Sequence, residues 1–184
     1  MSGSKSKFLL SNIWALSWNA SVQHAKIYEK EVNSNVRKDI SNNLKDYFEN
    51  QISKEYKSTV SAKKHINNIE LFQEFVISRY STFLHGGKYR FGVAQKLFNL
   101  YLKQLWVLDL IPSPPHFPID ELIQDLLRKK ASKGLSKNFY KIKWTKNDSV
   151  EDYMMVINFA EHVKSELGYK DLATLELELY NILL

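Results

Sequence analysis

The sequence contains no cysteine, and only six glycines and four prolines occur among its 184 residues. The absence of cysteine excludes disulfide bonds, zinc ribbons and iron–sulfur clusters held by thiolates. The five histidines show no H-x-x-x-H spacing, so we expect neither a metal site nor a cofactor. With so few glycines and prolines, long segments of the chain contain no helix breaker.

Long apolar runs are also missing, and none reaches the roughly 20 residues that a transmembrane helix needs. The stretch "FLLSNIWALSW" after Lys5 and Lys7 faintly resembles a signal peptide, but Asn12, serines and tryptophans interrupt its apolar region. We therefore expect a cytoplasmic protein with no membrane partner, in which residues 1–7 form a flexible arm and residues 8–184 form a single domain.

What the chain does contain is apolar residues at intervals of three and four positions, the period of an amphipathic helix. Only the short segment "FYKIKW" shows any alternation typical of a strand. The fold class predicted from this pattern is all-α, with about seven helices in one compact domain. The predicted helices are one opening at residue 8, one after a cap at Ser34, one from about Ser61 to the glycines at 86–87, and those near 93–108, 120–130, 149–166 and 172–184.

Charge is distributed unevenly, with 26 Lys and Arg against 20 Asp and Glu and a net charge of +6. Eight basic and no acidic residues lie between Arg128 and Lys146. Such a block repels itself unless an anion lies beside it, and because it is not amphipathic it favours nucleic acid over a membrane surface. A solvated basic loop is the plain alternative. The predicted phosphate-binding residues of this block are Arg128, Lys129, Lys130 and Lys133.

A second predicted phosphate site is the connection "HGGKYRFG", which joins two helices at residues 85–92. Free amides and the dipole at the start of the second helix would attract an anion, and glycine would let a backbone approach closely. The residues expected to bind nucleic acid here are Gly86, Gly87, Lys88, Arg90, Gly92, Val93 and Ala94.

All four prolines lie between residues 112 and 118, just before Asp120. The order of "FGVAQKLFN" and then "FPID" resembles the helix-hairpin-helix DNA glycosylases, the group of endonuclease III and 8-oxoguanine glycosylase. Their hairpin reads roughly L-P-G-V-G-x-K-x-A, ends in a catalytic lysine, and is followed by a Pro/Val-rich link to a catalytic aspartate. Lys96 and Asp120 match these two positions. Ala94 and Phe91 depart from the hairpin pattern, and the resemblance covers about thirty of the 184 residues.

The resemblance implies excision of a base from a flipped nucleotide, in DNA rather than RNA. Asp120 would stabilise the charge that develops on the sugar or activate a nucleophile. Lys96 would attack the sugar as a neutral amine and form a Schiff base. The aromatic residues proposed for the wedge or the base pocket are Tyr89, Phe91, Trp106 and His116.

Each of these residues also has a structural explanation. Asp120 is a good helix N-cap, Lys96 suits a solvated first turn, and aromatic rings at helical spacing usually belong to the core. The alternative functions are a non-catalytic nucleic-acid-binding module and a small bacterial or phage protein whose basic face meets an acidic partner. Only an enzyme requires Lys96 and Asp120 to meet in one pocket, so the distance between them separates these hypotheses.

Overall fold

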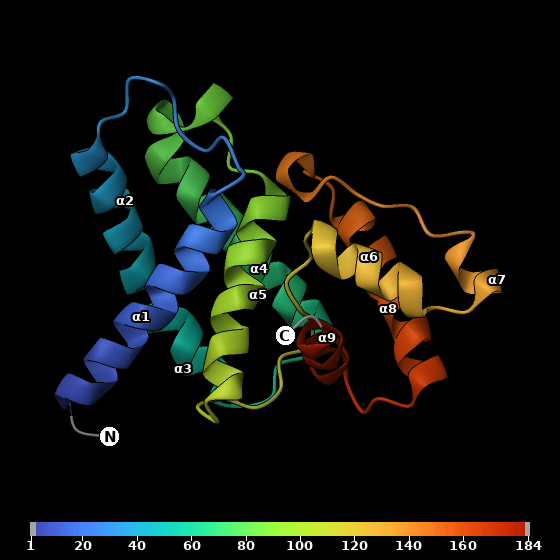
Figure 1. Ribbon diagram of the computed structural model, residues 1–184. Coiled ribbons are helices and arrows are strands. Elements are labelled where there is room, and N and C mark those ends of the chain that lie inside the picture. Colours follow the sequence, from blue (N-terminus) through green and yellow to red (C-terminus); the bar gives the residue numbers. More distant parts are fainter. Residues whose placement is uncertain (1–2, 183–184) are drawn as a thin grey trace.

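A computed structural model describes residues 3–182 and confirms the all-α prediction. Within these residues no strand is formed, and the only isolated β-bridge joins Tyr28 to Leu84. The described part of the chain has seven helices of ten or more residues, matching the seven predicted segments (Figure 1). They are α1 (Gly3–Val22), α2 (Ser34–Tyr47), α4 (Ala62–Tyr80), α5 (Phe91–Val107), α6 (Glu121–Lys130), α8 (Val150–Leu167) and α9 (Leu172–Asn181).

Shorter elements complete the chain. A short π-helix (Phe48–Ile52) and α3 (Ser53–Glu55) extend α2. Two 3₁₀ turns (Ser81–Phe83 and His85–Gly87) follow α4, and α7 (Lys133–Ser136) follows α6. A further 3₁₀ turn (Trp144–Lys146) precedes α8.

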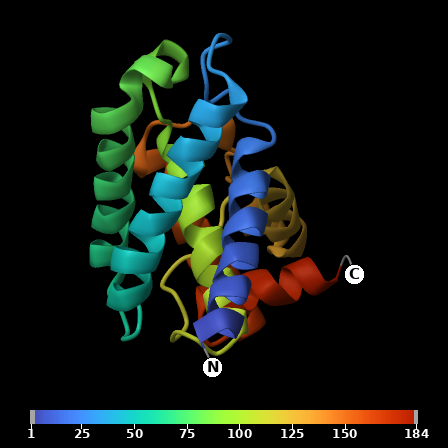
Figure 2. The ribbon, with the colours of Figure 1, turned by 90° about the vertical axis from the view of Figure 1, so that its left-hand side faces the viewer.

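Helix α5 lies at the centre of the molecule. Helices α1, α2 and α4 stand side by side on one side of it, while α6, α8 and α9 lie on the other (Figures 1 and 2). Every residue from Phe91 to Asn99 is buried, so the first half of α5 is covered all round. A helix in that position must bury its polar residues as well, which brings Gln95, Lys96 and Asn99 into the interior.

The helix starts are set by short polar side chains that accept a backbone N–H. Ser61, Asp120, Ser149 and Asp171 cap α4, α6, α8 and α9. The cap expected at Ser34 is instead Asn33, whose side chain accepts from the Val36 amide at 3.0 Å. Ser34 is therefore the first residue of α2 itself.

Helix α1 already begins at Gly3, so residues 3–7, which were expected to belong to a flexible arm, are helical in the structure. Met1 and Ser2 lie outside the described residues. Leu9 and Leu10 pack against the core while Ile13 and Trp14 are buried in it, so the helix extends outward from an anchored centre. Within residues 3–182 no helix has both the length and the apolar character to cross a membrane.

The proline segment between α5 and α6 is extended and has no regular secondary structure. Four closely spaced prolines predict an extended connection over the surface of the 93–108 helix. Pro114, His116, Phe117, Pro118 and Ile119 are all buried, so the segment enters the core instead of lying on it. Fixed proline φ angles leave such a segment little entropy to lose when it is held in this position.

Candidate active site and nucleic-acid interface

Lys96 and Asp120 meet in the structure. The Lys96 Nζ lies 3.2 Å from Asp120 Oδ2, with 9% of the lysine side chain and 28% of the aspartate side chain exposed. Asp120 also caps α6, because its Oδ1 accepts the Ile123 amide at 3.0 Å. The carboxylate thus serves as a helix cap through one oxygen and as the partner of a nearly buried ammonium through the other.

The Gln95 side chain fixes the position of Asp120 relative to Lys96. Its Oε1 accepts the Ile119 amide at 3.0 Å, and its Nε2 donates to the Ile119 carbonyl at 2.7 Å. Nε2 also donates to the Gly92 carbonyl at 2.9 Å. One buried side chain therefore ties the end of the proline segment to α5, and Asp120 follows Ile119 directly, so its backbone is fixed beside Lys96.

Trp144 covers Lys96 from the other side. The Lys96 Nζ lies 4.2 Å from the centroid of the Trp144 ring, a cation–π contact, and the tryptophan is buried. The sequence offered no signal for Trp144 in this role, because it lies 48 residues beyond Lys96 in the chain.

Gly92 is where the turn that carries Trp144 approaches α5. A Cβ built on Gly92 would lie 1.8 Å from the Trp144 carbonyl oxygen, and the Gly92 amide donates to the Asn147 carbonyl at 2.9 Å. The sequence predicted that the missing side chain of Gly92 lets the backbone come close to a bound phosphate, but the space is taken by the turn at Trp144. The approaching backbone belongs to the protein itself, not to a nucleic acid.

The phosphate site predicted at the start of α5 is therefore not available. Val93 and Ala94 are buried and both donate their amides to the Arg90 carbonyl at 3.0 Å. In the preceding turn, Gly86 donates to Glu29 Oε1 at 2.7 Å and Gly87 donates to the Leu84 carbonyl at 2.9 Å. The predicted backbone donors already have partners within the chain.

The side chains of the same connection are better placed to bind anions. Lys88 and Arg90 line a hollow of about 590 Å³, called here the basic hollow. Arg90 pairs with Asp148, which neutralises part of its charge. No carboxylate lines this hollow, and its other lysine and histidine side chains are His24, Lys26, His85, Lys143 and Lys146.

The basic stretch from Arg128 to Lys146 is divided by the fold. Lys143 and Lys146 reach the basic hollow, whereas Lys141 pairs with Glu121 and Asp125. The four predicted binding residues of this stretch lie at the far end of α6 and in α7, exposed to solvent (Figure 1). With a rise of about 1.5 Å per residue, the end of α6 lies roughly 15 Å from Asp120. Those four residues are Arg128, Lys129, Lys130 and Lys133.

The aromatic residues predicted as wedge or base pocket occupy other positions. Tyr89, Phe91 and His116 are at most 2% exposed and belong to the core, and of the three only Tyr89 also lines the basic hollow. Trp106 is partly buried on α5 and does not line the basic hollow. Rings at helical spacing next to a covered helix fill its packing surface, so their burial agrees with the structural alternative rather than the functional one.

Two further hollows meet at the Lys96–Asp120 pair. The first, called the lysine–aspartate hollow, measures about 700 Å³ and is also lined by His24, Lys143 and Trp144. It shares His24 and Lys143 with the basic hollow. The second, called the α9 hollow, measures about 300 Å³. Its polar lining consists of Lys96, Lys103, Gln104, Asp120, Glu176 and Tyr180.

A buried hydrogen-bond network lies in the core behind these hollows. His65 contacts Tyr56 OH at 2.7 Å through Nδ1 and Asn99 Oδ1 at 2.8 Å through Nε2. His116 Nδ1 contacts Tyr153 OH at 2.9 Å, and Asn99 donates to the same hydroxyl at 3.3 Å. Burial lowers the pKa of His116 to about 4 and holds that of His65 well below its usual value, so both rings are neutral at pH 7.

Comparison with known proteins identifies no relative: no family model, no curated protein and no solved structure matches this chain. Between residues 3 and 182 no group of three or more carboxylate and histidine side chains could hold a metal ion. Function must therefore be inferred from the geometry of the three hollows.

Proposed function

We propose that this protein excises a base from DNA, with Lys96 and Asp120 acting on the sugar of a flipped nucleotide. One observation carries the proposal: the two side chains meet at 3.2 Å on the wall of a 700 Å³ hollow that shares His24 and Lys143 with the basic hollow. Phosphates would lie along the lysines of the basic hollow, and the sugar would reach the Lys96–Asp120 pair.

Asp120 suits the first chemical step. A carboxylate beside the sugar stabilises the positive charge that forms as the glycosidic bond breaks, and it can accept a proton from an attacking water. In the resting structure Lys96 lies in contact with that carboxylate as an ammonium. An amine attacks only after it loses this proton, so base release through Asp120 is the primary reaction and strand cleavage through Lys96 is secondary.

The test is base release from single-stranded and duplex oligonucleotides that each carry one modified base, read as alkali-sensitive strand breaks. Asp120→Asn should reduce release at least 100-fold while the fold is kept, because Asn caps a helix about as well as Asp. Asp125→Asn is the matched control, since Asp125 lies on α6 and pairs with Lys141 but lines none of the three hollows. Equal activity of both variants would exclude Asp120 from catalysis.

Lys96 is tested separately with Lys96→Gln. This variant should lose any covalent complex that borohydride traps, because only an amine forms a Schiff base. Base release should persist in Lys96→Gln if Asp120 acts through water. If trapping survives the substitution, the covalent step belongs to another residue.

A second candidate is a nucleic-acid-binding module without catalysis. It is favoured because both oxygens of Asp120 already have partners, one in the cap of α6 and one in the pair with Lys96. The burial of most of the aromatic residues predicted as the wedge also favours it. Such a module would bind oligonucleotides with a steep dependence on salt and release no base. A protein that binds only acidic proteins would show no affinity for oligonucleotides at low salt.

The site of nucleic-acid contact can be mapped by charge reversal. Replacing Lys88 and Lys143 with Glu should weaken binding to all sequences alike, because phosphate contacts carry no sequence information. The same reversal at Lys129 and Lys130 should change affinity less, since those residues lie at the far end of α6. The opposite ranking would place the interface on α6 and α7.

A further inference from the structure

The three hollows lie in succession along α5 and form one groove, called here the α5 groove. The lysine–aspartate hollow shares His24 and Lys143 with the basic hollow, and it shares Lys96 and Asp120 with the α9 hollow. A ligand longer than a single nucleotide can therefore extend from one hollow into the next.

The floor of the α5 groove is one face of that helix. Side chains on one helical face recur at intervals of three and four positions. The residues of α5 that line the three hollows follow this spacing and are Val93, Lys96, Leu100, Lys103, Gln104 and Val107. At about 1.5 Å per residue, this face is roughly 21 Å long. About six nucleotides of a stacked strand, at roughly 3.4 Å each, cover that length.

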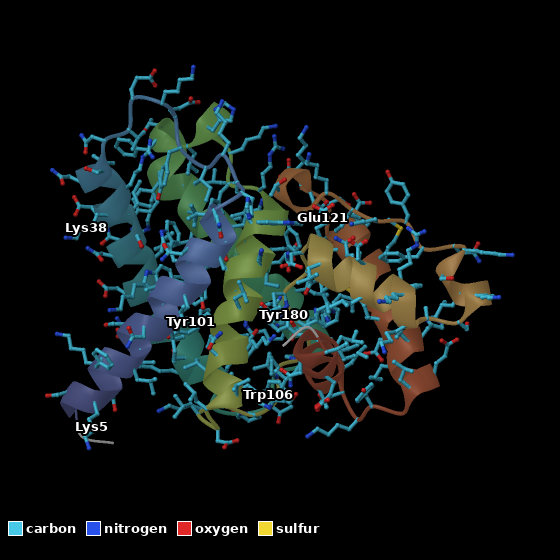
Figure 3. The ribbon with its side chains drawn as sticks, viewed as in Figure 1. Lys5, Lys38, Tyr101, Trp106, Glu121 and Tyr180 are labelled. Carbon is cyan, nitrogen blue, oxygen red and sulfur yellow. The ribbon has the colours of Figure 1, made fainter. Side chains whose placement is uncertain are left out.

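The two walls of the groove come from opposite sides of the molecule. Ala20 on α1 and the segment that follows it line one wall, while α6, α9 and the turn before α8 line the other (Figure 1). Figure 3 shows Glu121 of α6 and Tyr180 of α9 on the same side of α5. Only 9% of the Lys96 side chain is exposed, so a ligand reaches it from within the groove.

The charge that remains in the α5 groove is positive. Each carboxylate that lines it already pairs with a lysine, and the pairs are Asp120 with Lys96, Glu121 with Lys141, and Glu176 with Lys103. At the other end, in the basic hollow, Lys88, Lys143 and Lys146 are exposed and no carboxylate lines the surface. An anionic ligand is therefore attracted to this end of the groove.

The end of the groove at α9 offers apolar surface instead. Val107 and Tyr180 are 51% and 42% exposed, and Leu100 and Leu177 are partly exposed beside them. Proteins that bind single-stranded nucleic acid combine a basic groove that follows the backbone with aromatic side chains on which bases stack. The α5 groove presents both kinds of surface, in line along one helix.

The surroundings of Lys96 favour an unpaired strand over a duplex. Extruding a base from a duplex costs unpairing and unstacking energy, and a side chain that wedges between base steps helps to unstack them. Of the four aromatic residues predicted as wedge or base pocket, three are buried and Trp106 lines none of the three hollows. Tyr180 is exposed, but its neighbour Lys103 lies about 10 Å along α5 from Lys96. That distance is too long for Tyr180 to fill the gap left by a base flipped at Lys96.

We infer that the α5 groove binds single-stranded DNA, so that the reaction at Lys96 and Asp120 acts on a strand that is already unpaired. Phosphates on one side of the target nucleotide contact the lysines of the basic hollow. Bases on its other side pack against Val107 and Tyr180. This inference rests on the proposed function and names the substrate class of the same site.

The probes are fluorescein-labelled deoxythymidine oligomers of about two to ten nucleotides, which bracket the length of the groove, and a blunt-ended duplex of about two helical turns. Their affinities for the full chain are measured by fluorescence anisotropy at one low salt concentration, because phosphate contacts depend on salt. Affinity should rise up to about six nucleotides and change little beyond that length. The six-nucleotide strand should bind at least about tenfold more tightly than the duplex, because a duplex does not reach the floor of the groove.

Two pairs of variants locate the strand. Val107→Glu places a negative charge at the apolar end of the groove and should weaken binding of the six-nucleotide strand at least about fivefold, whereas Leu71→Glu on α4 should not. Tyr180→Ala removes a stacking surface and should also weaken it about fivefold or more, whereas Tyr140→Ala should not. Leu71 and Tyr140 are exposed and line none of the three hollows. If Val107→Glu unfolds the chain, Tyr180→Ala decides alone.

Three results would overturn the inference. The first is a duplex that binds as tightly as the six-nucleotide strand, and the second is equal binding by the two members of each variant pair. The third is a peptide of glutamates, equal in charge to the strand, that binds more tightly at the same salt. That result would assign the groove to an acidic protein.

The groove and the reaction fail in different ways. Base release from a duplex at least as fast as from a single strand would refute the single-strand groove and leave the proposed excision intact. A preference for single strands without base release from any oligonucleotide would support the groove and refute the excision activity.

Discussion

The buried pair of His65 and His116 should make this protein sensitive to acid. The two ring centroids are 4.9 Å apart, and both histidines are at most 2% exposed. Among residues 3–182 their hydrogen-bond partners are the hydroxyls of Tyr56 and Tyr153 and the amide of Asn99, and none of these groups carries a negative charge that would compensate a protonated ring. Protonation of either ring therefore opposes folding.

The magnitude follows from the pKa of His116, which burial lowers from 6.5 to about 4. A group whose pKa is lower in the folded state binds fewer protons there than in the unfolded state. Its contribution to stability is complete above the unfolded value of 6.5 and is lost as the pH falls toward 4. Between pH 8 and pH 5 this linkage removes about 2 kcal/mol from the free energy of unfolding.

The assay is urea unfolding followed by far-ultraviolet circular dichroism at pH 8, 7, 6 and 5. Other groups titrate over this range, so the wild type is compared with His116→Gln, whose amide can still contact the Tyr153 hydroxyl. The variant should be less stable than the wild type at pH 8 but should lose about 2 kcal/mol less on acidification. If both proteins lose equal stability between pH 8 and pH 5, His116 does not carry the effect and the reasoning is wrong.

Three further perturbations test the surroundings of the site. Gly92→Ala should destabilise the protein by about 3 kcal/mol or more in thermal unfolding, because the new Cβ would lie 1.8 Å from the Trp144 carbonyl oxygen. Gly134→Ala is the control, because nothing lies near its Cβ, and it should change stability by less than about 1 kcal/mol. Asp120→Ala should lower the free energy of unfolding by about 1 kcal/mol more than Asp120→Asn, because both lose the ion pair but only Ala loses the helix cap; equal losses would contradict the capping geometry. Lys88→Glu and Lys143→Glu should each weaken oligonucleotide binding, measured by fluorescence anisotropy, and together they should reduce the slope of log affinity against log salt. An unchanged slope would exclude the basic hollow as the phosphate-binding site.

The helices could be predicted from the sequence because their causes are local. Apolar residues at intervals of three and four, with caps such as Ser61 and Asp120, define a helix and its start within a dozen residues. The cap of α2 was misplaced by one residue, since Asn33 and Ser34 are both good caps and the sequence does not rank them. A short motif also suggested that Lys96 and Asp120 lie close together, because only the rest of one helix and a stiff proline segment separate them in the chain.

The surroundings of that pair depended on contacts between distant parts of the chain. Trp144 and Glu176 come from segments far from Lys96 in sequence, and no spacing rule connects them. The sequence indicated that Gly92 permits close approach, but only the fold decided that Trp144 would be the neighbour. Likewise, periodicity cannot tell whether an aromatic ring such as Phe91 faces a core or a ligand, because burial depends on which helices pack around α5. Local patterns therefore determined the helices, and long-range packing alone determined which side chains line the hollows.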